Sequence, residues 1–88
     1  MRRSIRPLFN FDPPANDEDI RAAARQFVRK LSGFARPSRA NQASFEAAVD
    51  EVADSARRLV ASLTTQQPPR DRAVEAERAR ERVRRRFA

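Results

Sequence analysis

The sequence predicts an all-α fold, and three observations support this prediction. Ala and Arg dominate the composition, and both residues favour helix. A single glycine among 88 residues argues against tight β-hairpins, whose turns usually need glycine. Two long stretches carry apolar residues three and four positions apart, which is the spacing of an amphipathic helix. We therefore expect a short N-terminal apolar segment, an antiparallel helical hairpin over about 17–32 and 39–64, and a basic C-terminal helix.

The N-terminal segment "SIRPLFNF" (4–11) is too apolar for a free tail, so we expect a turn or short helical piece packed on the hairpin. "DPPAN" (12–16) follows as a loop, because its two prolines disfavour helix. A core this small needs every aromatic residue. Phe9 and Phe34 are therefore expected inside it.

The first helix has clear signals at both ends. Asn16 is a favourable N-cap, the acids at 17–19 suit the positive end of the helix dipole, and Asp19 approximates a capping box. Gly33 falls where a left-handed C-cap is needed, which makes this end the best-defined boundary in the chain. The expected apolar stripe consists of Ile20, Ala23, Ala24, Phe27, Val28 and Leu31.

The second helix is expected after the stop and restart signals Pro37 and Ser38. Its acids Glu46, Asp50 and Asp54 lie four apart, which predicts a solvated face or a face paired with arginines of the first helix, at 21, 25 or 29. The expected apolar stripe consists of Phe45, Val49, Val52, Ala56, Leu59, Val60 and Leu63.

The chain divides into a helical domain (1–64), a Pro-containing linker (65–70) and a basic helix (71–88). The terminal helix has a thin apolar stripe of Ala76, Ala79, Val83 and Phe87, so it is expected to be weakly docked or free. Residues 1–10 carry a net charge of +3, residues 11–69 carry none and residues 70–88 carry +4. The pattern indicates a neutral body with basic ends.

Several chemistries are disfavoured. The chain has no histidine and no cysteine, which removes the commonest general base, the commonest metal ligand and any disulfide. No apolar run approaches the roughly 18 residues that a membrane-spanning helix needs. We expect no enzymatic activity, metal or cofactor, no membrane association and a cytoplasmic location.

Two functions fit this pattern. The first is a protein-interaction module that self-associates or docks on a larger, acidic complex. The second is non-specific nucleic-acid association, because arginine is well suited to phosphate. The two hypotheses share the same candidate contact residues, which are Arg80, Arg82, Val83, Arg84, Arg85, Arg86, Phe87, Arg2 and Arg3.

The stretches "IRPLFNFDPPA", "DEDIRAAARQFVRKLSGF", "PSRAN", "FEAAVDEVA" and "PPRDR" together resemble a family of small, uncharacterised bacterial proteins. Members of that family usually begin Met-Cys-Arg-Asn-Ile. Here Arg2 stands in place of the cysteine and Ser4 in place of the asparagine. The resemblance implies an all-α fold and a bacterial cytoplasm, and it brings no assigned activity.

A weaker local resemblance is to J-domains, which also place an apolar segment and a Pro-containing loop before a capped, basic helix. In that family, activity on the Hsp70 partner rests on a His-Pro-Asp motif after this helix. This chain has Ser32-Gly33-Phe34 there. The likeness therefore implies a similar helical layout without co-chaperone activity.

Overall fold

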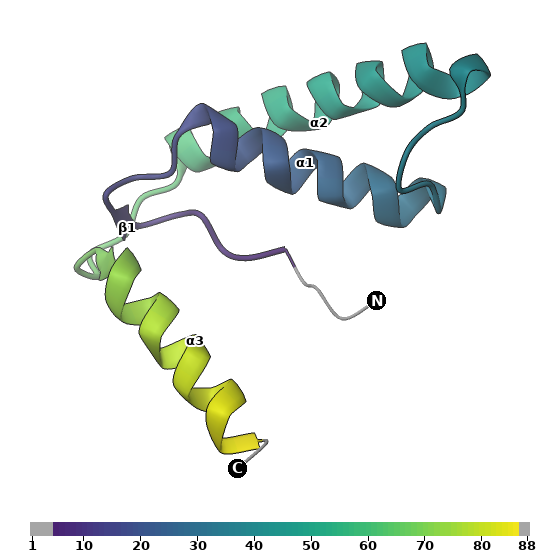
Figure 1. Ribbon diagram of the computed structural model, residues 1–88. Coiled ribbons are helices and arrows are strands. Elements are labelled where there is room, and N and C mark those ends of the chain that lie inside the picture. The colour runs from purple at the N-terminus through teal and green to yellow at the C-terminus, as the bar shows by residue number, and fades with distance from the viewer. Residues whose placement is uncertain (1–4, 87–88) are drawn as a thin grey trace.

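The computed structural model describes residues 5–86, which form three α-helices, a 3-10 turn and a small strand pair. Helices α1 and α2 run antiparallel as a hairpin, and α3 projects away from the hairpin's open end (Figure 1). The predicted all-α hairpin is confirmed. In chain order the elements are β1 (Phe11–Asp12), α1 (Asp17–Ser32), η1 (Arg39–Asn41), α2 (Gln42–Ser62), β2 (Arg70–Asp71) and α3 (Arg72–Arg86).

Helix α1 begins and ends at the predicted residues. The Asn16 side chain accepts the N–H of Asp19 at 2.8 Å, and the Asp19 carboxylate accepts the N–H of Asn16 at 2.9 Å. This completes the capping box. Gly33 has a φ of +79°, and its N–H donates to the Arg29 carbonyl at 2.9 Å. A side chain is strained at this φ, which explains why the only glycine occupies this position.

The second half of the hairpin is shorter than the predicted range 39–64. Its first three residues form the 3-10 turn η1, and α2 ends at Ser62. Leu63 is already extended, although its N–H still donates to the Leu59 carbonyl at 3.1 Å. The β-branched pair Thr64–Thr65 and the prolines that follow do not favour further helical turns.

The core is a single strip between the two helices. Each helix contributes three buried residues four positions apart, and Ala24 and Ala53 allow the two backbones to approach closely. Leu8, Ala48, Val52 and Ala56 pack at the edges of this strip. The buried residues are Ile20, Ala24, Val28, Phe45, Val49 and Ala53.

Several residues expected inside the core are exposed. Leu31 is 76% exposed, Phe27 42% and Phe34 41%, so the prediction that Phe34 is a core residue is wrong. Leu59 and Leu63 are exposed as well. Two helices in contact shield only the stripe that lies between them, and the flank of that stripe needs a further layer to cover it. The hairpin therefore leaves one apolar flank open.

The N-terminal segment packs on the hairpin without forming a helix. Leu8 reaches the core and Phe9 is half-buried, whereas Ile5 is exposed. The expected turn or helical piece is thus mostly extended chain that ends in β1. Pro7 disfavours helix in the residue before it and has no N–H to donate.

A short parallel strand pair joins the two ends of the body. Phe11 pairs with Arg70 and Asp12 with Asp71, and the Arg70 N–H donates to the Asn10 carbonyl at 2.9 Å. The Asn10 side chain donates to the carbonyls of Gln67 and Pro68. The end of the expected linker is therefore held against the N-terminal segment.

Helix α3 is attached at its beginning. The Asp71 carboxylate accepts the N–H of Val74 at 3.0 Å, which caps the first turn. Ala76 and Ala79 are half-buried, whereas Val83 is 51% exposed. The outer turns of α3 extend into solvent (Figure 1).

Candidate functional site

Most of the candidate arginines on α3 are paired with acids of the same helix. Arg80 binds Glu77, and Arg84 binds Glu81. Arg85 lies 3.6 Å from the other carboxylate oxygen of Glu81. These pairs are exposed, so each stabilises the helix only weakly. They also neutralise much of the positive charge on which the nucleic-acid hypothesis depends.

Within the described part of the chain, the remaining candidate residues on α3 are not held in ion pairs. Arg82 and Arg86 have no acidic partner among residues 5–86, and Val83 is open to solvent between them. Arg86 is exposed at the end of α3, whereas Arg82 faces the N-terminal segment across a hollow. Arg2, Arg3 and Phe87 lie outside the residues that the structure describes. The structure therefore does not gather the predicted residues into one site.

Of the three acids spaced four apart in the acidic stripe of α2, Glu46 and Asp50 pair with arginines of α1. This is one of the two arrangements that the sequence predicted. Arg25 donates to both carboxylate oxygens of Glu46, at 2.8 and 3.0 Å, and Arg21 lies 2.9 Å from Asp50. The Arg25 hydrogen bonds hold the pKa of the Glu46 carboxyl below its usual range. Arg29 does not join the stripe, because its Nε donates to the Ala35 carbonyl.

A second set of ion pairs closes the open end of the hairpin. Arg57 donates to Asp17 of α1 at 2.7 Å and also contacts Asp54 of its own helix. The pKa of Arg57 is raised, mainly because its guanidinium donates a hydrogen bond to Asp54 and also because it donates one to Asp17. The acids of the hairpin thus hold α1 against α2.

An apolar groove runs along the uncovered flank of the hairpin. We call it the hairpin groove. Its volume is about 330 Å³, and both helices and the loop between them contribute to its walls. The sequence placed most of these residues in a core, but Phe27, Leu31 and Phe34 are exposed because the two helices form a single layer. The apolar residues at its centre and rim are Phe27, Leu31, Phe34, Phe45, Ala48 and Val52.

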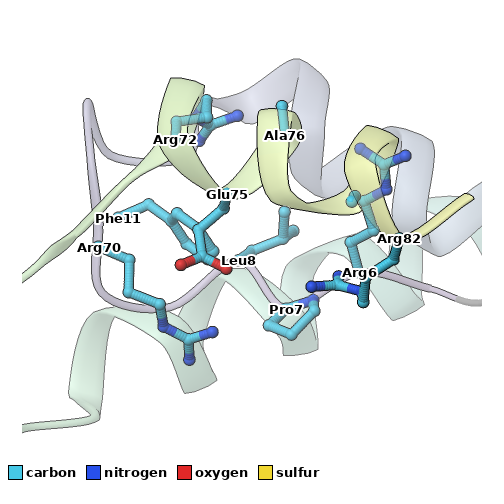
Figure 2. A pocket seen from close by; sticks show the side chains of 10 residues that line it. Arg6, Pro7, Leu8, Phe11, Arg70, Arg72, Glu75, Ala76 and Arg82 are labelled. Atoms are coloured by element: carbon cyan, nitrogen blue, oxygen red, sulfur yellow. The ribbon is translucent and has the colours of Figure 1, made fainter. Parts of the chain in front are cut away.

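A second hollow, which we call the arginine hollow, lies between the N-terminal segment and α3 (Figure 2). Its volume is about 580 Å³. Sequence reasoning missed it, because its residues come from two stretches, 6–11 and 70–82, that are far apart in the chain. The charged and aromatic side chains that line it are Arg6, Phe11, Arg70, Arg72, Glu75 and Arg82.

Within residues 5–86, no group of three or more carboxylates is arranged to hold a metal ion. None of the helices in that range combines the length and the apolar character needed to cross a membrane.

The fold and these surfaces define a small, mostly helical protein built on a hairpin. A family model for an uncharacterized conserved protein (DUF2277) matches residues 1–78, and the chain belongs to this family. The matched span includes the hairpin and Arg6, Arg70 and Arg72, and it ends before the candidates at 80–87. Comparisons with curated proteins and with solved structures gave no significant match, so the J-domain likeness rests on sequence layout alone.

Proposed function

We propose that this protein is a non-enzymatic protein-interaction module that self-associates through its hairpin groove. The observation that supports the proposal is an uncovered apolar flank on a one-layer hairpin. Phe27, Leu31 and Phe34 all expose more than two-fifths of their surface there. Stable domains usually consist of at least two packed layers, and large exposed apolar areas mark interaction surfaces.

The dimensions of the molecule support the same proposal. Its smallest principal extent is 16 Å, only slightly more than the roughly 10–12 Å diameter of one helix. The radius of gyration is 15.5 Å, whereas a compact chain of this length has a value of about 12 Å. The molecule is therefore extended for its length, and both the projecting α3 and the single-layer hairpin contribute to this.

The excess surface is large enough for a stable interface. The accessible surface is 7242 Å², about 1,900 Å² more than the roughly 5,300 Å² expected of a compact protein of this mass. A stable dimer interface buries about 1,200–2,000 Å² in total, so each copy would need to contribute only about half of its excess.

The distribution of charge favours a second copy as the occupant of the groove. Residues 11–69 carry no net charge, so two hairpins can approach without overall repulsion. Arg36 and Arg39 lie at the loop end of the hairpin, while Glu18 lies at the other end. An antiparallel, two-fold arrangement brings these opposite charges together and forms a four-helix bundle.

The proposal is tested by the solution mass. Light scattering and sedimentation equilibrium are measured between about 1 and 300 µM, a range that covers micromolar dissociation constants. The expected mass is twice the 10.1 kDa of the monomer at high concentration. Leu31→Asp is expected to give a monomer of unchanged helicity, because Leu31 is 76% exposed in the monomer.

Val83→Asp is the matched comparison, because Val83 is an exposed apolar residue outside the hairpin groove. This variant is expected to remain dimeric. A wild-type protein that is monomeric throughout the concentration range overturns the proposal. Dissociation by Val83→Asp but not by Leu31→Asp overturns the assignment to the groove and points to the α3 surface.

A further inference from the structure

Three arginines without acidic partners line the arginine hollow. Within residues 5–86, no ion pair forms at Arg6, Arg70 or Arg82, although most other arginines of α3 are paired. Arg6 and Arg82 lie toward one end of the hollow, beside Pro7, and Arg70 lies near Phe11 toward the other (Figure 2). Like charges that share one hollow make the potential there positive, which favours the binding of an anion.

The fold holds these side chains in place. Arg72, Glu75, Ala76, Ala79 and Arg82 are spaced along one face of α3, and that face is turned toward residues 6–11. Pairing of β1 with β2 fixes Arg70 beside Phe11, whose ring lies 5.1 Å from the Arg70 guanidinium carbon. The site therefore exists only when both ends of the chain are assembled.

The carboxylates nearby do not neutralise the three cations. Asp19 is bound to Arg72, and Glu75, the acid of the hollow, lies 3.2 Å from Arg78. In Figure 2 the Glu75 side chain lies between the two groups of arginines. The balance in the hollow remains positive.

We infer that the arginine hollow binds a small molecule that bears phosphate groups. The arginine fork donates paired hydrogen bonds to phosphate oxygens, and a phosphomonoester carries about −1.5 to −2 charges at neutral pH. A volume of about 580 Å³ lies within the range of small-molecule sites, roughly 300–1,000 Å³. Pro7, Leu8 and the two alanines provide apolar walls for the rest of the ligand.

A small ligand fits this arrangement better than a nucleic-acid backbone. Arg6, Arg70 and Arg82 line one concavity, whereas a nucleic-acid surface spreads its cations along the strand. The outward arginines of α3, such as Arg80 and Arg84, are already bound to glutamates. Arg70 and Arg72 both lie over the Phe11 ring, so this ring is not free to stack on an extended series of bases.

The inference is tested by titrating the full chain with inorganic pyrophosphate at about 50 and 200 mM salt, using calorimetry and amide NMR shifts. Saturable binding is expected at one site, with shifts confined to residues 6–11 and 70–82. Arg82→Gln and Arg6→Gln should each raise the dissociation constant about tenfold, because each removes one charge-assisted contact. Glu75→Gln should lower the dissociation constant, because it removes a negative charge from the hollow.

Arg58→Gln is the control, because it removes the same charge from an exposed position on α2 without an ion pair among the described residues. It should leave the affinity unchanged. Absence of saturable binding, or an equal effect of Arg58→Gln, overturns the inference. Preferential binding of duplex DNA that displaces pyrophosphate also overturns the inference in favour of a nucleic-acid surface.

Leu31→Asp should not affect pyrophosphate binding, since the hairpin groove and the arginine hollow share no residue. The pyrophosphate result is therefore independent of self-association.

Discussion

The guanidinium of Arg72 donates to the carboxylate of Asp19, 53 residues earlier in the chain, at 3.3 Å. The same carboxylate oxygen accepts the N–H of Asn16 and so completes the capping box of α1. Arg72 also donates to the Pro13 carbonyl and lies over the Phe11 ring. One side chain at the start of α3 therefore attaches that helix to the loop and first turn that begin the hairpin.

Loss of this attachment is expected to loosen α3 without unfolding the hairpin. Arg72→Gln removes the ion pair, which is partly exposed and so contributes about 1 kcal/mol or less. Hydrogen exchange at the amides of residues 75–80 should become up to about fivefold faster, while exchange in α2 stays unchanged. Arg78→Gln is the control, because Arg78 pairs only with Glu75 of its own helix among the described residues. Equal exchange rates in wild type and Arg72→Gln would contradict the assigned role.

The left-handed residue after α1 gives a second prediction. Gly33→Ala is expected to lower the free energy of unfolding by about 1 kcal/mol, because a Cβ at a φ of +79° is strained. No atom lies within 4 Å of the added Cβ, so the cost comes from the backbone alone. Gly33→Asn should cost less, since asparagine tolerates this conformation better. Chemical denaturation followed by circular dichroism measures both variants. An alanine variant as stable as wild type would show that the C-cap conformation is not required.

The Arg25–Glu46 pair predicts how stability depends on pH. The pKa of Glu46 is lowered in the folded state from its ordinary value of 4.5, so its contribution is fully present above that value and is lost as pH falls through the lowered pKa. The stability difference between wild type and Glu46→Gln should therefore be largest above about pH 5 and should disappear in acid. Glu51→Gln serves as the comparison, because Glu51 is exposed and has no ion pair within residues 5–86. A difference that does not change with pH would contradict the role of the pair.

Helix α1 shows how well local signals predict structure. Its first turn depends on Asn16 and Asp19, three residues apart, and its end depends on a single residue, Gly33. Such signals act over one turn of chain and need no information about distant contacts. The end of α2 was predicted less well, because neither a glycine nor a proline stands directly after Ser62.

The hairpin groove and the arginine hollow could not be predicted from local signals of this kind. Periodicity identifies which positions of a helix are apolar, but not whether a second layer exists to cover them, and so Leu31 was expected inside. The arginine hollow brings together Arg6, Arg70 and Arg82, which no local pattern connects. Sequence reasoning instead assigned the basic character of α3 to one contact surface, whereas most of its arginines either pair with glutamates of the same helix or line the hollow.

The sequence by itself determined the helices, the caps of α1, the hairpin and the location of charge at the two ends, because each depends on the intrinsic preferences and spacing of nearby residues. Only the tertiary structure decided which apolar residues stay exposed and which arginines remain without partners. The exposed apolar residues follow from the single layer of the hairpin. The positions of the arginines in the hollow depend on the β1–β2 pairing and on the Asp19–Arg72 contact, which join segments more than 50 residues apart. Contacts of that range are set by how whole elements pack, and the sequence of any one element does not encode them.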